Sequence, residues 1–155
     1  MDKYSTSRVM PFTAQQMFNM VVDIEQYPQF VPICKKAEIG PREDLGDGTF
    51  AFDSLLVFRF KKFGIFEEFR SRVTCDPENY TVNSWSDGPP FKEFRAVWSF
   101  EDVGEKLSEA HIDVSYQFRS RALGMFISRG AGIGIERLIQ AWDARAHEIY
   151  GGVAA

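Results

Sequence analysis

The stretch 108–119, SEAHIDVSYQFR, decides the fold class, because its apolar and polar residues alternate. Successive side chains of a β-strand point to opposite faces of the sheet, so this alternation predicts a strand with one dry and one wet face. Ile112, Val114, Tyr116 and Phe118 fall on the dry face. Such a strand is typical of an antiparallel sheet that packs one face on a core and leaves the other in water.

Outward from this stretch, turn-forming residues at 40–41, 46–48 and 76–79 divide the preceding chain into further strands. The predicted strands begin at Lys35 and continue as 49–60, 63–75, 80–86, 92–101 and 108–119. One more strand, 4–10, opens the chain and ends at Pro11. A sheet of about seven strands is therefore expected.

Two short helices are predicted between the first strand and the rest of the sheet. Thr13 and Gln16 have the spacing of a capping box, in which each side chain binds the other residue's backbone N–H, so a helix is predicted over 13–23. A second helix is predicted over 25–31, with Pro28 in its first turn, where a missing N–H is tolerated.

After Arg121 the apolar residues recur at helical spacing to the end of the chain. The predicted apolar stripe comprises Leu123, Phe126, Ile127, Leu138, Ile139, Trp142, Ala146 and Ile149. Gly130, Gly132 and Gly134 interrupt this pattern, and each glycine destabilises a helix interior by about 1 kcal/mol relative to alanine. One long C-terminal helix is predicted, loosened or kinked near these glycines.

The resulting element order predicts an α+β fold in one domain, residues 1–155. A curved antiparallel sheet of about seven strands surrounds the long C-terminal helix, and two short helices follow the first strand. One helix covers only part of a concave sheet face. The uncovered space is apolar and elongated, which is the environment that a hydrophobic ligand requires.

The composition narrows the class of function. Phenylalanine occurs 15 times, so flat rings fill either a core or a ligand cavity. The net charge of −4 disfavours a dedicated nucleic-acid-binding protein. Two cysteines, Cys34 and Cys75, form neither a CxxC motif nor a disulfide framework, which suits a reducing cytoplasm. The start of the chain has no apolar signal core, and a cytoplasmic protein is expected.

The sequence contains no cluster of catalytic residue types. His111 and His147 are the only histidines, and they are expected on a polar strand face and near the end of the last helix. Glu67 and Glu68 are adjacent in a strand and therefore point to opposite faces, so they cannot act together as acid and base, although one could bind a polar head group. The glycines of 130–134 lack the spacing of a nucleotide-binding loop. No metal and no cofactor are expected, and the chain is not predicted to be an enzyme.

Four blocks of sequence resemble one known family in the same order. These blocks are 22–34 (VDIEQYPQFVPIC), 71–74 (SRVT), 87–92 (DGPPFK) and 98–100 (WSF). The chain resembles the coenzyme Q-binding and ribosome-association toxin (RatA) branch of the START-like, helix-grip superfamily, often labelled polyketide cyclase/dehydrase. It departs from that pattern at Pro90, which doubles a proline, and in the glycines of the last helix.

This resemblance implies a helix-grip fold and the binding of ubiquinone or a related isoprenoid lipid in support of respiration. For some bacterial members it implies interference with the joining of ribosomal subunits, so the large ribosomal subunit is the alternative partner. The basic run 59–62 (RFKK) is interpreted either as a solvated strand end or as a contact for the phosphates of a membrane or of RNA. Peripheral contact at the inner membrane would accompany a lipid ligand.

Strand parity, helical spacing and the resemblance together predict the ligand-lining residues. The predicted set is Tyr27, Phe30, Phe52, Phe58, Phe69, Val73, Phe91, Phe94, Trp98, Val114, Phe118, Leu138 and Trp142. The proline-rich segments 27–32 and 87–91 are expected to lie together at one end of the molecule. There their rings would either admit a ligand or close the end of the core.

Overall fold

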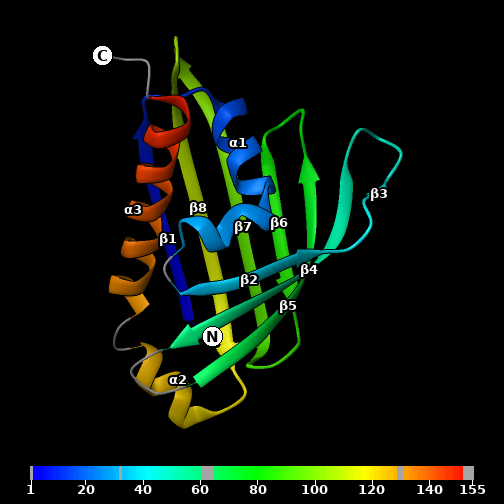
Figure 1. Ribbon diagram of the computed structural model, residues 1–155, viewed down its shortest axis with the longest axis vertical. Helices are drawn as coiled ribbons and strands as arrows, with labels where there is room; N and C mark the ends of the chain where they lie inside the picture. The colour runs from blue at the N-terminus through cyan, green and yellow to red at the C-terminus, as the bar shows by residue number, and fades with distance from the viewer. Residues whose placement is uncertain (1, 32, 61–64, 129–130, 152–155) are drawn as a thin grey trace.

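The computed structural model describes residues 2–31, 33–60, 65–128 and 131–151 (Figure 1). The elements are β1 (Asp2–Met10), α1 (Ala14–Val22), the 3₁₀ helix η1 (Ile24–Gln29), β2 (Cys34–Ile39), β3 (Glu43–Asp44), β4 (Phe50–Phe60), β5 (Ile65–Asp76), β6 (Thr81–Ser86), β7 (Phe91–Gly104), β8 (Leu107–Phe118), α2 (Arg121–Ser128) and α3 (Ala131–Tyr150). The strands form one sheet in the order β1-β8-β7-β6-β5-β4-β2, and β3 pairs with β4. The predicted α+β class with a curved antiparallel sheet is confirmed.

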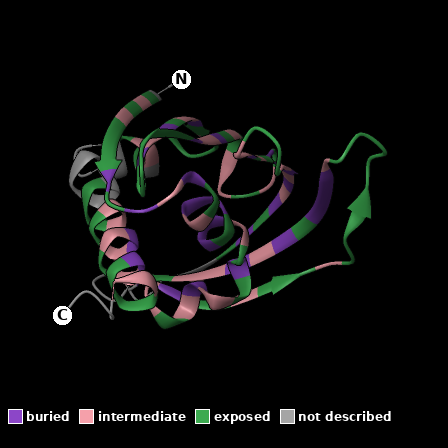
Figure 2. Ribbon diagram, turned by 90° about the horizontal axis from the view of Figure 1, so that it is seen from above, coloured by how far each residue is buried: buried purple, intermediate pink, exposed green. Residues whose placement is uncertain are grey.

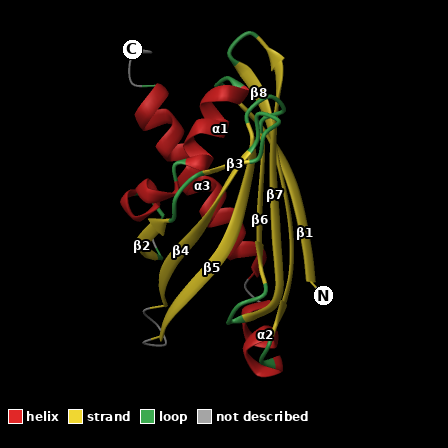
Figure 3. Cartoon of the chain, turned by 90° about the vertical axis from the view of Figure 1, so that its right-hand side faces the viewer, coloured by secondary structure: helices red, strands yellow, loops and turns green. Residues whose placement is uncertain are grey.

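The alternation in β8 determines which face of the sheet is buried. Ile112 and Tyr116 are buried, whereas Asp113 and Gln117, the residues that follow them, are exposed. In the register, Ile112 pairs with Trp98 of β7. We call the face that carries these buried residues the inner face. Figure 2, seen from above, shows the sheet wrapping around α1, and Figure 3 shows α1 and α3 on one side of the strands with α2 below their lower ends.

Helix α1 begins as its capping box predicts. The Thr13 side chain accepts a hydrogen bond from the Gln16 N–H at 3.1 Å, and the Gln16 side chain accepts one from the Thr13 N–H at 3.0 Å. Asp102 of β7 adds a further acceptor at 2.8 Å for the Ala14 N–H. Met17 and Val21 are buried one turn apart, so the helix packs with one side against the inner face.

The second short helix differs from its prediction. It is a 3₁₀ helix that begins at Ile24, and Pro28 lies near its end rather than in its first turn. The Asp23 N–H closes α1 by donating to the Asn19 carbonyl, and the Asp23 carbonyl at once accepts from the Gln26 N–H. Because Asp23 both ends α1 and accepts the first hydrogen bond of η1, the second helix begins at Ile24, one residue before its predicted start.

The predicted single C-terminal helix is two helices in the structure. Helix α2 lies at the lower end of the sheet, and α3 runs along one side of it (Figure 1). Gly124 of α2 approaches the Phe118 side chain closely enough that a Cβ there would lie 3.5 Å from it. A helix that follows β8 directly must change direction before it can lie across the sheet. The predicted loosening at Gly130 falls outside the described residues, and α3 continues through Gly132 and Gly134.

The end of α3 corrects one member of the predicted apolar stripe. Ile149 is 47% exposed, whereas Ala146 is fully buried. Tyr150 packs there instead, with its ring 6.0 Å from that of Phe12 and its hydroxyl donating to the Gln16 carbonyl at 3.1 Å. Helical spacing placed Ile149 near the stripe, but the side of α3 that contacts α1 carries Tyr150, the next residue, and leaves Ile149 in solvent.

Candidate functional site

The strand residues predicted to line a ligand all fall on the inner face. Phe52 pairs with Val73, Phe58 lies beside Phe69, and Phe94, Trp98, Val114 and Phe118 share one face of β7 and β8. Phe52, Phe69 and Val73 are buried, and the others are half-buried. Leu138 of α3 is half-buried against the same core.

Five aromatic rings on the lower part of this face form a cluster, which we call the phenylalanine cluster. Its members are Phe58, Phe69, Phe91, Phe94 and Phe118. The ring centroids lie 4.8 Å apart for Phe69 and Phe94, and 4.7 Å apart for Phe91 and Phe118. Of the five, only Phe69 is buried, although all five rings belong to the interior side of the sheet. The cluster thus keeps apolar surface that the described side chains cover incompletely.

Higher on the same face, Trp142 of α3 holds the helix against the sheet and η1. Its ring centroid lies 5.4 Å from that of Trp98, 5.1 Å from that of Tyr27 and 5.3 Å from that of Phe30. The Tyr27 hydroxyl donates to the Val21 carbonyl, and burial raises the pKa of this phenol. Tyr27 and Phe30 therefore fill the space between the end of α1 and Trp142 of α3.

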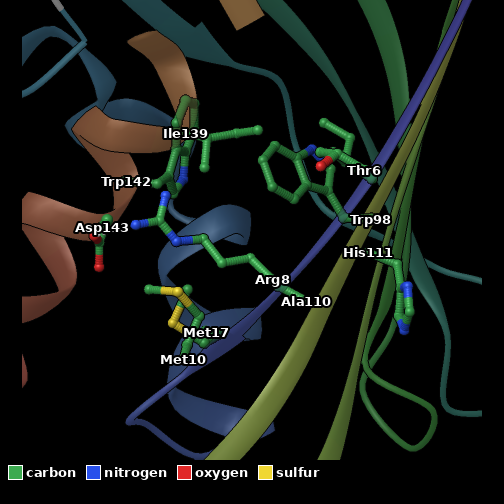
Figure 4. A pocket seen from close by; sticks show the side chains of 11 residues that line it. Thr6, Arg8, Met10, Met17, Trp98, Ala110, His111, Ile139, Trp142 and Asp143 are labelled. Atoms are coloured by element: carbon green, nitrogen blue, oxygen red, sulfur yellow. Dashed lines mark hydrogen bonds and ion pairs between the residues drawn. The ribbon is translucent and has the colours of Figure 1, made fainter. Parts of the chain in front are cut away.

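A small cleft remains between α3 and strands β1, β7 and β8, with a volume of about 30 Å³ (Figure 4). We call it the tryptophan cleft. Thr6, Arg8, Trp98, Trp142 and Asp143 contribute its polar groups, and Met10 and Met17 close one end. A single water requires about 10–15 Å³ by this kind of measure, so the cleft admits a small polar group and not a whole lipid.

A buried row of hydroxyl groups crosses the inner face of the central strands, and the sequence analysis missed it. Ser54, Ser71 and Ser86 are all buried. The Ser54 and Ser71 oxygens lie 2.9 Å apart, and Ser86 accepts a hydrogen bond from the Gly88 N–H at 3.1 Å. Parity could have located Ser54 and Ser71, because each occupies a dry-face position between apolar neighbours, whereas Ser86 follows Ser84 on its strand face.

The two proline-rich segments do not lie together as expected. Phe30 contacts Tyr27 and Trp142, whereas Phe91 contacts members of the phenylalanine cluster. Figure 1 shows η1, between α1 and β2, at mid-height and the turn from β6 to β7 near α2 at the lower end. The reason is that Phe30 packs against Trp142 of α3, whereas Arg119 bonds the turn from β6 to β7 to the end of β8.

Arg119 fastens the turn between β6 and β7 to the end of β8. Its backbone N–H donates to the Pro90 carbonyl at 3.0 Å. Its side chain donates to the carbonyls of Phe91 at 2.9 Å and Asp87 at 2.6 Å. One arginine thus holds three carbonyl groups of this segment.

Both histidines take ordinary structural positions. His111 lies within 2.8 Å of Glu109, and Figure 4 shows its ring on the far side of the strands from the other residues drawn. His147 is exposed and contacts the Asp143 carbonyl and the edge of Phe12. Glu68 is exposed beside Arg70, and the register pairs Glu67 with Phe58. Over residues 2–31, 33–60, 65–128 and 131–151, His, Cys, Asp and Glu side chains form no group that could hold a metal.

Comparison with known proteins agrees with this geometry. A sequence model of the family described as "Polyketide cyclase / dehydrase and lipid transport" matches residues 10–143. The chain belongs to this family. This polyketide cyclase/dehydrase family protein is 27% identical over 145 residues to the mitochondrial coenzyme Q-binding protein of Schizosaccharomyces pombe, covering 92% of this chain and 85% of the relative. It is 26% identical over 150 residues to the ribosome association toxin RatA of Escherichia coli (strain K12), covering 97% and 90% of the two chains.

A solved structure confirms the START-like fold of this polyketide cyclase/dehydrase family protein. The START superfamily protein from Mycobacterium smegmatis superimposes with a TM-score of 0.79 at 20% identity. The match covers 95% of this chain and 98% of the other. Within the part of the chain that the structure describes, no helix is long and apolar enough to cross a membrane.

The thiols of this family member are expected to be unreactive in the native state. Cys34 and Cys75 are buried, and burial raises the pKa of the Cys75 thiol to about 12. An aromatic disulfide reagent at pH 8 should modify them only after denaturation, because the thiolate is the reactive form. Rapid modification of the native protein would show that these positions open to solvent.

The same shift in pKa predicts how stability depends on pH. A folded-state pKa above the unfolded value of about 8.5 means that the native state retains its proton longer. The free energy of unfolding should therefore fall as pH rises from about 9 towards 12, and Cys75→Ala should flatten this fall. Urea unfolding at pH 8 and pH 10 measures the change in the free energy of unfolding. An equal change for the wild type and Cys75→Ala would contradict the attribution of this pH dependence to Cys75.

Proposed function

We propose that this protein binds a hydrophobic ligand, ubiquinone or a related isoprenoid lipid, between the inner face and α3. The observation that carries the proposal is the incomplete burial of the phenylalanine cluster. Phe58, Phe91, Phe94 and Phe118 lie on the interior side of the sheet and yet remain half-buried. Covering apolar surface is favourable by about 25 cal/mol per Å², so an apolar chain laid over these rings would gain binding energy.

In this proposal the protein acts as a carrier or chaperone that supports respiratory electron transport, and not as an enzyme. The relative named as a coenzyme Q-binding protein supports the choice of ligand. Among the polar groups that line the tryptophan cleft, the charged pair Arg8 and Asp143 is already engaged in an ion pair of 3.1 Å. We place the protein in the cytoplasm, with transient contact at the inner membrane surface where the lipid is exchanged.

The test is mass spectrometry of organic extracts from protein purified without detergent, followed by titration with ubiquinone. A quinone or isoprenoid lipid recovered in about one copy per chain, and unchanged after prolonged incubation, is the expected result. An extract without lipid, together with no saturable binding of added ubiquinone, would contradict the proposal. Chemical conversion of the bound molecule would show that the protein is an enzyme.

A second candidate function is binding to the large ribosomal subunit, and the outer face of the sheet favours it. Trp85 is 40% exposed there, and the register places it between Arg72 of β5 and Arg95 of β7. Trp85 and Arg72 line an open groove of about 620 Å³, which the serine row of the inner face also lines. An exposed ring between two arginines is suited to stack on an unpaired RNA base. The relative named as a ribosome association toxin supports this candidate.

Trp85→Ala tests the second candidate with little effect on the fold. Base–aromatic stacking contributes about 1–3 kcal/mol, so co-sedimentation with the large subunit should weaken roughly tenfold or more. Trp85→Phe, which keeps a stacking ring, should retain most binding. Absence of co-sedimentation by the wild-type protein, or equal co-sedimentation by Trp85→Ala, would contradict this use of the outer face.

A further inference from the structure

The indole N–H of Trp142 has no hydrogen-bond partner within the described residues, although its side chain is deeply buried. Trp142 is 8% exposed, and its Nε1 atom is inaccessible to solvent. Buried polar groups in native proteins are nearly always paired, so an orphan donor calls for a partner outside the chain. Trp142 lines the tryptophan cleft, and Figure 4 shows it facing Trp98 across that space.

The lining of the cleft is mainly apolar, and a few polar side chains border it. The Thr6 hydroxyl and the Arg8 guanidinium also line it. One N–H of Arg8 is used by Asp143 at 3.1 Å, and a guanidinium carries five N–H groups. The indole N–H of Trp142 and the guanidinium of Arg8 can only donate, so an acceptor oxygen is the group that would satisfy the unpaired indole.

The size and position of the cleft limit how much of a ligand it can hold. A volume of about 30 Å³ accommodates an oxygen atom and its carbon, but not a ring between the two tryptophans, whose centroids are 5.4 Å apart. Trp98 and Phe94 lie on the same face of β7, four residues apart, which is about 13 Å along a strand. The cleft and the phenylalanine cluster thus lie on the same face of the sheet, one beyond the other along β7.

We propose that the tryptophan cleft is the head-group subsite of the bound lipid, where Trp142 Nε1–H donates to a carbonyl oxygen. The ligand class is a lipid with a carbonyl-bearing head, such as a quinone, oriented with its head under α3 and its tail over the phenylalanine cluster. This inference rests on the proposed carrier function. The serine row offers the competing location, because Ser54, Ser71 and Ser86 also present buried hydroxyl groups.

The decisive experiment compares Trp142→Phe with the matched control Ser71→Ala. The first change removes the N–H and keeps a ring against Tyr27 and Phe30, and the second removes a hydroxyl from the serine row. Each protein is titrated with a short-chain ubiquinone and with an isoprenoid hydrocarbon of similar length. Trp142→Phe should weaken quinone binding roughly tenfold, as expected for one lost hydrogen bond in a buried site, and leave hydrocarbon binding unchanged. Ser71→Ala should change neither.

The outcomes separate this inference from the carrier function. If the wild-type protein binds neither probe, the carrier function fails and the subsite fails with it. If it binds quinone but Trp142→Phe binds equally well, or Ser71→Ala alone loses affinity, the subsite is overturned and the carrier function stands.

A measurement on the wild-type protein keeps the test independent of the folding of the variant. The indole N–H resonances of Trp85 and Trp98 can be assigned with Trp85→Phe and Trp98→Phe, which leaves the third to Trp142. Short-chain ubiquinone should shift the Trp142 resonance and the hydrocarbon should not. An unmoved Trp142 resonance at saturating quinone would overturn the proposal.

Discussion

Replacing Phe69 with alanine is expected to lower the free energy of unfolding by about 3–5 kcal/mol. Phe69 is 6% exposed, and its ring lies 4.8 Å from that of Phe94 and 5.6 Å from that of Phe91. Truncation removes the centre of the phenylalanine cluster and leaves a cavity that half-buried neighbours fill poorly. Urea unfolding monitored by circular dichroism measures the change.

Met125→Ala is the control for this prediction. Met125 is 67% exposed on α2, so its truncation should change the free energy of unfolding by no more than about 0.5 kcal/mol. A loss of less than about 1 kcal/mol for Phe69→Ala would mean that the cluster collapses easily and that its packing contributes little to the fold.

Trp98→Ala is expected to weaken ligand binding by more than its loss of stability explains. Trp98 is half-buried, contacts Trp142, and lies between the tryptophan cleft and Phe94. Its removal enlarges the cleft and interrupts the apolar path between head and tail. Stability should fall by about 3 kcal/mol, at the lower end for a tryptophan truncation because the ring is incompletely buried. Ubiquinone affinity, measured on the folded fraction, should fall tenfold or more.

Phe18→Ala provides the matched comparison for Trp98→Ala. Phe18 is 4% exposed on α1 and contacts Tyr80, so its truncation should be at least as destabilising. It does not line the tryptophan cleft, and folded Phe18→Ala protein should bind ubiquinone like the wild type. If both variants lose stability and neither loses affinity, Trp98 belongs to a plain core and the ligand lies elsewhere.

Local rules predicted the elements whose signals are contained in a few neighbouring residues. The capping box of Thr13 and Gln16 located the start of α1, and parity placed Phe52, Phe69 and Val73 on the buried face. Both rules depend only on the geometry of one element, and a one-residue error in parity would have exposed the whole face. The resemblance to a family supplied the connection between these elements.

The parts that could not be predicted depend on contacts between distant residues. The division of the last helix into α2 and α3 and the exposure of Ile149 had no signal in the local pattern, because the helical spacing of apolar residues runs through both. The separation of Phe30 from Phe91 follows from the packing of Phe30 against Trp142 of α3. The unpaired N–H of Trp142 became visible only when α3 was placed over β1, because an indole on an apolar stripe resembles any other core ring.

The hydrogen bonds of Arg119 tie the turn between β6 and β7 to the end of β8, so this turn is not the part of the molecule that opens first. With its carbonyls at Asp87, Pro90 and Phe91 bonded to one arginine, this turn cannot move without the end of β8. Local opening favours the segments with the fewest such bonds, so the amide hydrogens of Asp87, Gly88 and Phe91 should exchange slowly and together with those of β8. A ligand would then enter between other elements of the fold, and the turn between β6 and β7 would stay in place while it does so.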